Sequence, residues 1–379
     1  MKALINLILL LVSFASLATV RTVSNDPAVP AQFTTTGEGG NTSFNAAHTA
    51  SSPGDTIYIY GTRFSYGTLT ISKRLVVIGA GYGPNNQFGQ PTRADNVSFF
   101  RDGSTDPSGS VIAGLLVSSN INCTGTLATN NITIFRNSIN SYIYTYLNSS
   151  NLGSGWTIYN NIVYGILGGA SSRISSSSSN LLIANNIITG QVGYFNPPSV
   201  TIDHNVFLGS SNLNSVWNAV ITNNIFVRSS GNIFANEVVF CTFNKNISNQ
   251  NTIGAAAQYN PTNIFEATYL GTGGGANSGS GNLTGTNPLF INVPDNSTYS
   301  NTYNYRLQSS SPGKNYATDG TDVGIYGGSY PFPSGGAAGS GFDTSPMPPI
   351  PQVTSVNILN STIAPNGTLN VQVQGRVNN

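Results

Sequence analysis

A short pattern of apolar and asparagine positions recurs through the middle of the chain. In each copy an aliphatic or aromatic residue is followed by two variable residues, then an asparagine and, in most copies, an aliphatic residue. Short β-branched runs such as residues 181–183 lie between the copies, and nothing shows a sustained helical period. The last asparagines of the copies are spaced by 24, 25, 19, 19 and 22 residues, and they are Asn137, Asn161, Asn186, Asn205, Asn224 and Asn246.

This repeat predicts a parallel β-solenoid. A unit of about 22 residues with three short strands fits one coil of such a fold, and successive coils stack about 4.8 Å apart. Equivalent residues then lie above one another, so we expect the six asparagines to form a hydrogen-bonded ladder. Asparagine also tolerates the left-handed backbone of a tight bend, which suits it to this position. A two-sheet sandwich with asparagine-rich turns is the alternative, but it does not explain the constant register.

Both ends of the repeat region carry motifs that resemble a known superfamily. PGDTIYI at 53–59, GTLTISK at 67–73 and LVVIGAG at 75–81 resemble the opening coils of the pectate-lyase-like proteins, with a capping helix near 45–48. NPLF at 287–290 and TDVG at 321–324 are similar to the last coils of many secreted bacterial members. The resemblance implies an all-β, right-handed, single-stranded parallel β-helix over residues 51–328, after an N-terminal cap at 19–50.

Segments outside the solenoid have their own signatures. Lys2, an apolar run and small residues up to Ala18 predict a signal peptide at 1–18, so we expect the mature protein to be secreted, extracellular or at the cell surface. No later stretch approaches transmembrane length. Residues 329–351 are rich in Pro, Gly and Ser and predict a linker. Residues 352–379 predict a β-hairpin, which either caps the solenoid or serves as an anchoring tail.

Composition narrows the choice of ligand. Only 7% of residues are charged, against about 25% in ordinary soluble proteins, and the net charge is +1. Nucleic acid is therefore not an expected partner, because its binding needs a basic surface. Cys123 and Cys241 are expected to be buried free thiols, with one disulfide between them as the alternative, and neither has the spacing of a metal ligand. We expect no metal or other cofactor, and composition does not predict the oligomeric state.

Few residues could carry catalysis. The segment that contains Asp203 and His204 resembles the Trp-Ile-Asp-His stretch of pectate lyases, but it lacks the tryptophan, and no Arg-x-Pro-x-x-Arg segment is present. Together with Glu237 and Lys245 these two residues are weak catalytic candidates, and calcium is expected only if the protein is a lyase. One repeat position forms a column beside Asp203 that is either a basic stripe for an anionic sugar or a solvated turn, and its members are Arg136, Asn160, Asn185, His204, Asn223 and Lys245.

Aromatic residues point to carbohydrate. Tyr142, Tyr144 and Tyr146 alternate, so on a strand they share one face, where their rings could stack on sugars. The alternative is that they only pair with neighbouring strands. We therefore predict a secreted or surface protein that contacts an extracellular polysaccharide or cell-surface glycan without catalysis, or that is structural or adhesive. The alternative is a polysaccharide lyase or glycoside hydrolase that acts on such a glycan.

Overall fold

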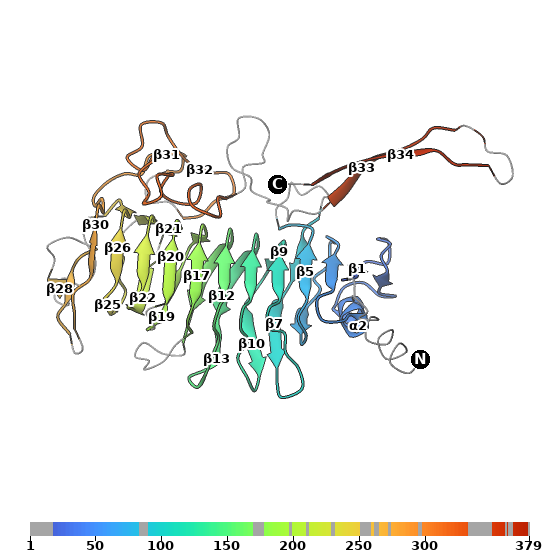
Figure 1. The fold of residues 1–379 in the computed structure, drawn as a ribbon, viewed down its shortest axis with the longest axis horizontal. Coiled ribbons are helices and arrows are strands. Elements are labelled where there is room, and N and C mark those ends of the chain that lie inside the picture. Colours follow the sequence, from blue (N-terminus) through green and yellow to red (C-terminus); the bar gives the residue numbers. More distant parts are fainter. Residues whose placement is uncertain are drawn as a thin grey trace, which may run out of the picture.

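The computed structural model describes residues 18–82, 90–169, 178–196, 199–209, 212–228, 232–250, 259–260, 265–271, 274–294, 298–332, 351–360, 362 and 367–377. These residues form an elongated solenoid of parallel strands (Figure 1), so the predicted fold class is confirmed. The predicted signal peptide lies outside the described residues except for Ala18, and most of the predicted linker, 333–350, lies outside them as well.

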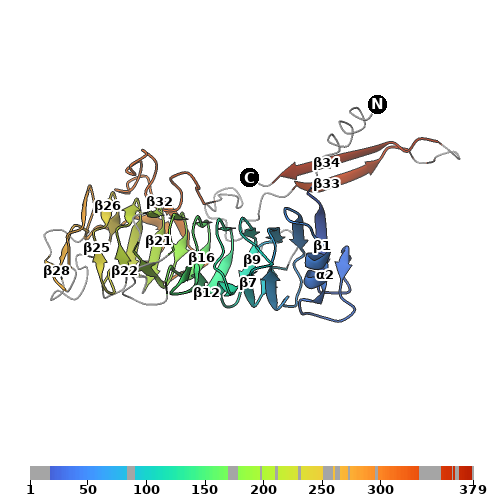
Figure 2. The same cartoon turned by 60° about the horizontal axis from the view of Figure 1, so that its bottom comes forward.

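Each coil contributes strands to three faces of the solenoid (Figure 2). The first face begins at the edge with β2 (Phe33–Thr34) and continues with β1 (Val20–Ser24), β3 (Thr56–Ile59), β5 (Val76–Gly79), β8 (Val111–Ala113), β11 (Thr133–Phe135), β15 (Thr157–Tyr159), β17 (Leu181–Ala184), β20 (Val200–Asp203), β23 (Val220–Thr222), β26 (Thr242–Asn244) and β30 (Ser278–Ser280).

The second and third faces are joined where two long strands turn a corner. These strands are β12 (Ser138–Tyr144) and β16 (Ile162–Leu167), and their register shifts between Ile139 and Tyr142. The rest of the second face is β6 (Thr92–Ala94), β9 (Leu115–Val117), β18 (Ile187–Ile188), β21 (Val206–Gly209), β24 (Ile225–Arg228) and β27 (Ile247–Ser248). The rest of the third face is β4 (Thr68–Ile71), β7 (Asn96–Arg101), β10 (Ile121–Gly125), β19 (Gln191–Phe195), β22 (Asn212–Trp217) and β25 (Val238–Val239).

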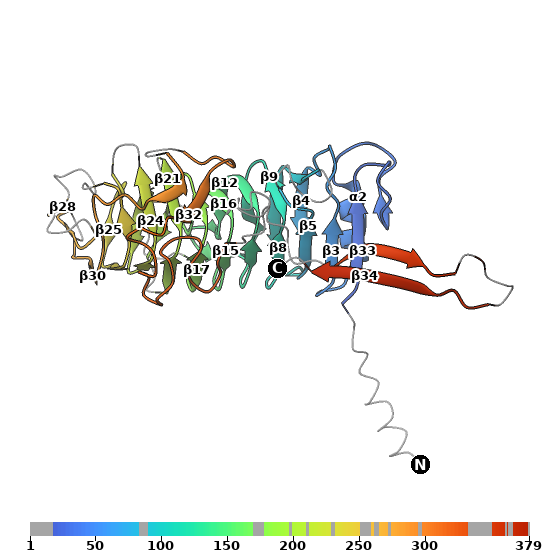
Figure 3. The ribbon, with the colours of Figure 1, turned by 90° about the horizontal axis from the view of Figure 1, so that it is seen from above.

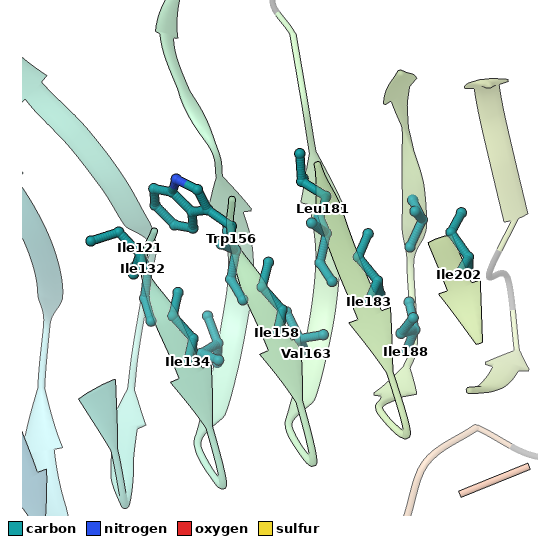
Figure 4. Close-up of a cluster of buried hydrophobic side chains, with 14 of the residues drawn as sticks. Ile121, Ile132, Ile134, Trp156, Ile158, Val163, Leu181, Ile183, Ile188 and Ile202 are labelled. Carbon is teal, nitrogen blue, oxygen red and sulfur yellow. The ribbon is translucent and has the colours of Figure 1, made fainter. Parts of the chain in front are cut away.

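The core is a stack of aliphatic side chains that repeat from coil to coil. Ile134, Ile158 and Ile183 of the first face pair in register and are fully buried, in a row that Figure 4 shows. Val163 and Ile188 of the second face pack against the same interior. Burial of each such side chain contributes roughly 1.5–3 kcal/mol, so the repeated inward positions provide the main driving force for folding.

The six repeat asparagines lie buried at the corner between the first and second faces. The side-chain Nδ2 of each donates to Oδ1 of the next at 3.0 Å, and Asn246 continues the series to Asn282. The backbone N–H of each asparagine also donates to the same Oδ1 atom, at 2.8–3.0 Å. We call residues 137, 161, 186, 205, 224, 246 and 282 the asparagine column.

The left-handed backbone expected at these asparagines falls instead on the residue before each of them. Arg136, Asn160, Asn185, His204, Asn223 and Lys245 have φ values between 52° and 59°. The bend therefore occurs one residue earlier, and it directs the following asparagine side chain into the interior. The expectation about backbone conformation was wrong by one position, because the sequence pattern contains two consecutive polar residues at this corner.

Helix α2 (Thr42–Ala50) lies at the N-terminal end of the solenoid, over the region where the capping helix was expected. It packs against β1 through Phe44 and Ala47, which are fully buried. Nε2 of His48 accepts a hydrogen bond from the backbone N–H of Ser72 at 3.1 Å. Burial, with Lys73 nearby, lowers the pKa of His48 from 6.5 to about 4, so this imidazole is a neutral acceptor at pH 7.

Residues 287–294 and 298–332 lie along the outside of the second face instead of forming further coils (Figures 1 and 3). They include the antiparallel pair β31 (Phe290–Asn292) and β32 (Asn304–Leu307). Val323 and Ile325 of this segment share a buried apolar cluster with Ile187, Val206 and Ile225, which point outward from the solenoid. We call residues 287–294 and 298–332 the covering segment. The motifs expected to close the last coils thus cover a face, since the second face is apolar on its outer side.

The remaining strands form short antiparallel pairs. They are β13 (Tyr146–Asn148) with β14 (Asn151–Leu152), β28 (Tyr259–Asn260) with β29 (Thr268–Tyr269), and β33 (Pro351–Ile358) with β34 (Val371–Val377). The last pair forms the hairpin expected within 352–379, and residues 361 and 363–366 between its strands lie outside the described residues. The role expected for the hairpin, a cap or an anchor, stays a prediction. Cys123 and Cys241 are buried and unbridged, as expected.

Candidate functional site

The three alternating tyrosines lie on the outside of the third face. Tyr142 and Tyr144 flank the buried Ile143 on β12, and Tyr146 follows the buried Thr145. The ring centroids of Tyr142 and Tyr144 are 5.6 Å apart, and those of Tyr144 and Tyr146 are 5.8 Å apart. All three rings are half-buried, so they form one continuous aromatic row that solvent can reach.

Neighbouring coils extend this row with more tyrosines and with amides. Tyr164 of β16 is 41% exposed, and its ring lies edge-on to Tyr142 with centroids 5.0 Å apart. Nε2 of Gln191 donates to the Tyr142 hydroxyl at 3.3 Å. Nδ2 of Asn214 donates to Oε1 of Gln191 at 2.7 Å and to the Tyr194 hydroxyl at 3.4 Å. We call Tyr142, Tyr144, Tyr146, Tyr164 and Tyr194, with Gln191 and Asn214, the tyrosine wall.

Glycines on the next coil set the orientation of two of these rings. A Cβ atom on Gly190 would lie 2.8 Å from both Cε atoms of Tyr164, and one on Gly165 would lie 2.7 Å from Cε1 of Tyr142. Both rings therefore pack against positions that have no side chain. Their planes are nearly perpendicular, at 89°, so the pair presents a ring face and a ring edge side by side, and a sugar can pack on the exposed face.

The tyrosine wall is uncharged. Burial, together with Tyr164, raises the pKa of Tyr142 to about 12, and burial also raises the pKa values of Tyr144 and Tyr146. Their hydroxyls are therefore protonated at neutral pH and can donate or accept hydrogen bonds. Sequence reasoning identified the row within β12 but missed Tyr164, Gln191, Tyr194 and Asn214. The signal for them was the coil register, which places these residues on successive turns of the same face.

Asp203 and His204 lie beneath the covering segment. Nδ1 of His204 is 2.9 Å from Oδ2 of Asp203, and Oδ1 of Asp203 accepts hydrogen bonds from Thr222 and Asn223 at 2.7 and 2.9 Å. On the other side of the imidazole, Nε2 lies 3.3 Å from the Thr321 hydroxyl. Burial alone would raise the pKa of Asp203, but His204 and these hydrogen bonds outweigh it and lower that pKa.

The Thr321 hydroxyl is engaged by two other partners within the covering segment. It donates its single proton to Oδ1 of Asp319 at 2.6 Å and accepts from the Gly328 backbone N–H at 2.9 Å. His204 itself is only 1% exposed. The arrangement therefore joins the covering segment to the solenoid around a buried imidazole.

The other two catalytic candidates lie elsewhere. Nζ of Lys245 sits 3.9 Å above the ring of Tyr316 in the covering segment. Glu237 precedes β25 on the third face, is 7% exposed and accepts a hydrogen bond from the Tyr269 hydroxyl at 3.3 Å. The structure places Asp203 and His204 side by side but does not bring Glu237 or Lys245 to them.

The column that contains His204 is neither a free basic stripe nor a solvated turn. Nδ2 of Asn160 donates to the carbonyl of Tyr330 at 2.6 Å, and Nδ2 of Asn185 donates to that of Gly327 at 2.7 Å. Asn223 exchanges two hydrogen bonds with Thr318. Asn160, Asn185, His204 and Asn223 are thus attachment points for the covering segment, which sequence reasoning could not place there.

The described residues hold neither a cluster of metal ligands nor a membrane-spanning helix. Within the described ranges, no three His, Cys, Asp or Glu side chains gather as a metal site would require. The part of the chain that the structure describes also holds no helix of the length and apolarity needed to cross a membrane.

The fold and the wall define a parallel β-solenoid protein with an uncharged aromatic surface on its third face. No protein-family model matches the chain, and neither does any curated protein. Among solved structures, it is similar to the alginate lyase from Paenibacillus sp. str. FPU-7, at 14% identity over 70% of this chain and 95% of that one, with a TM-score of 0.25. A likeness at this score carries no argument about activity or site residues.

Proposed function

We propose that this protein binds an uncharged extracellular polysaccharide through the tyrosine wall. The observation that carries the proposal is the continuous row of solvent-accessible tyrosine rings on the third face, with neighbouring centroids 5.0–5.8 Å apart. Sugar rings have apolar faces that pack against aromatic rings, so such a row suits a chain of sugars. The predicted signal peptide would bring the wall into contact with glycans outside the cell.

The shape and charge of the wall favour a long neutral chain over a small or acidic ligand. The wall extends over several coils of a flat sheet, whereas sites for small molecules are usually concave. It consists of tyrosines and amides, and the hydroxyls of β12 stay protonated at neutral pH. Amides of Gln191 and Asn214 supply both donors and acceptors for sugar hydroxyls. Binding should therefore depend little on salt concentration.

The alternative of a lyase or hydrolase finds less support in the described residues. Asp203 and His204 are engaged beneath the covering segment, and Glu237 lies on another face. Hydrolysis needs two carboxylates within about 5–9.5 Å across a substrate, and β-elimination needs an accessible base. We therefore assign no catalytic step to these residues.

The direct test is retention of the pure protein on insoluble neutral polysaccharides and on a glycan array. We expect Tyr164→Ala to weaken binding roughly 2- to 10-fold, because a stacked ring contributes about 0.5–1.5 kcal/mol beyond its buried area. Gly190→Ala should have a similar effect, since its Cβ would displace the Tyr164 ring. Tyr60→Ala is the matched control, because Tyr60 is a half-buried tyrosine next to the first face.

Two results would refute the proposal. One is that no glycan retains the wild-type protein, and the other is that Tyr164→Ala and Tyr60→Ala bind equally well.

The same preparation should be assayed for new reducing ends and for unsaturated uronide. A signal that disappears in Asp203→Ala and Lys245→Ala would support the enzymatic alternative.

A further inference from the structure

Two aromatic side chains lie at the corner between the third and first faces, beyond the tyrosine wall. Trp217 ends β22, and Phe240 follows β25, the strand that pairs with β22 (Figure 1). Their ring centroids are 6.3 Å apart, and the ring planes meet at 66°. Phe240 is 50% exposed and Trp217 is partly exposed, so solvent reaches both rings. We call these two residues the corner pair.

The backbone of Phe240 is left-handed, with a φ of 57°. The strand registers of the first face place the same corner position of four other coils at Asn131, Gly155, Asn180 and Asn218, which have φ values between 51° and 74°. Asparagine and glycine adopt this conformation readily, whereas a bulky side chain rarely does. Phe240 therefore occupies a position that favours asparagine or glycine, and strain of this kind clusters at functional sites.

Packing holds the ring of Phe240 in place. The ring lies against Gly275, where any side chain would collide with it. The carbonyl of Gly275 in turn accepts a hydrogen bond from the backbone N–H of Tyr269 at 3.1 Å. An aromatic ring with a fixed support loses little conformational freedom when it binds a ligand, and a ring face that solvent reaches can stack on a sugar.

The corner pair continues the aromatic row of the tyrosine wall. Tyr194 of the wall lies on β19, which pairs with β22 so that Phe195 faces Val216. Phe195 and Val216 are buried, whereas Tyr194 and Trp217 beside them are partly exposed. The third face runs from β12 to β25 through four strand pairings, which correspond to about 19 Å along the solenoid. The wall and the corner pair thus form one aromatic row along the long axis.

We infer that the corner pair is a second sugar-stacking subsite, and that the ligand is an extended, unbranched, β-1,4-linked neutral glycan that lies along the solenoid. Glycans of this class are straight ribbons whose sugar rings present apolar faces in succession, so one chain can contact the tyrosine wall and the corner pair together. An α-1,4-linked glucan coils and would leave the row after a few sugars. This inference rests on the function proposed above, because it extends the same binding surface and names the class of glycan.

The experiment is titration of the full chain with cellohexaose, mannohexaose and maltohexaose, followed by calorimetry and by tryptophan emission. We expect cellohexaose or mannohexaose to bind at least about tenfold more tightly than maltohexaose. Of the two tryptophans, Trp156 is fully buried, so a change in emission on binding should come from Trp217 and disappear in Trp217→Phe.

Phe240→Asn is the decisive variant, because it restores the residue found at Asn131, Asn180 and Asn218. Binding of the preferred hexaose should weaken roughly 2- to 10-fold with the loss of one stacked ring. The urea midpoint should stay the same or rise, since asparagine relieves the left-handed strain. Ile291→Asn is the matched control: Ile291 is 51% exposed on β31 of the covering segment, and its replacement should leave binding unchanged.

Each failure has a separate meaning. A lower urea midpoint in Phe240→Asn would show that the ring serves to pack against Gly275, and would overturn the inference. If Tyr164→Ala weakens binding and Phe240→Asn does not, the corner pair is not a subsite, although the proposed function stands. If the protein is retained by another neutral glycan but binds neither cellohexaose nor mannohexaose, or binds maltohexaose as tightly, the class of glycan is wrong. Failure to bind any glycan would refute the proposed function as well.

Discussion

Asn205 lies in the middle of the asparagine column, and its replacement tests the contribution of that column to stability. Its Nδ2 donates to the carbonyls of Ile183 and Asp203 at 2.8 and 3.0 Å, and to Oδ1 of Asn224 at 3.0 Å. Its Oδ1 accepts from the backbone N–H and from Nδ2 of Asn186, at 2.9 and 3.0 Å. The side chain is fully buried, so water cannot replace these partners.

The expected loss follows from the groups that Asn205→Ala leaves unsatisfied. The backbone N–H of Asn186 loses its acceptor, and the carbonyl of Ile183 loses a donor. Each buried polar group without a partner costs about 1–3 kcal/mol, so we expect the free energy of unfolding to fall by roughly 2–6 kcal/mol. That is a large part of the 5–15 kcal/mol typical of folded proteins.

Asn205→Asp separates the acceptor role of this side chain from its donor role. The variant keeps an oxygen for Asn186, but it places a second oxygen against the carbonyls of Ile183 and Asp203 and against Oδ1 of Asn224. At neutral pH this variant should be at least as unstable as Asn205→Ala, because the buried carboxylate faces three acceptors. Part of the loss should be recovered as the pH falls, since a protonated carboxyl regains one donor.

The measurement is the urea midpoint from far-ultraviolet circular dichroism, with the slope of the transition compared among variants. Asn140→Ala is the matched control, because Asn140 is an exposed asparagine on β12, in the same coil as the first column residue, Asn137. If Asn205→Ala and Asn140→Ala unfold at the same midpoint, the column does not stabilise the solenoid. A changed slope would show instead that the coils no longer unfold as one unit.

Three further predictions concern titratable and buried groups. Burial lowers the pKa of His48 from 6.5 to about 4. The free energy of unfolding should therefore reach its maximum above about pH 6.5 and decrease as the pH falls toward 4. In His48→Gln the urea midpoint should depend less on pH over this range. Burial raises the pKa of Cys241 to about 12 and also raises the pKa of Cys123. A disulfide reagent should therefore label both thiols only after the protein unfolds. Rapid labelling of the native protein would contradict this prediction. His204→Ala should speed proteolysis within 315–330 several-fold; unchanged cleavage would show that His204 does not fasten this segment.

The coil architecture could be predicted from sequence because each coil repeats the same physical requirement. An inward isoleucine such as Ile158 and a column asparagine such as Asn161 must recur in register, or the stack has gaps and unpaired amides. The repeat therefore carries the information about the fold many times over. The position of the left-handed residue could not be predicted, because each corner has two adjacent polar residues. The sequence does not indicate which of the two adopts the left-handed backbone.

The functional surface was only partly predictable. Tyr142 and Tyr144 alternate on β12 and Tyr146 begins β13 two residues later, so their spacing in the sequence alone places them together. Tyr164 and Tyr194 join them only through the register between coils, which depends on coil lengths that vary along the chain. Residues brought together by the covering segment, such as Arg136 and Arg306, are about 170 positions apart and share no local pattern.

The covering segment nevertheless left a signal in the repeat. On the second face, Ile162 follows the column asparagine and points outward, while the next residue, Val163, points into the core. A strand with water on one side alternates apolar and polar residues, so two successive aliphatic residues indicate burial on both sides. The same outward position is apolar at Ile187, Val206 and Ile225. Because an outward apolar stripe of this length needs a partner, the repeat itself required a layer over the second face, and the polar corner beside it provided the hydrogen bonds that hold this layer.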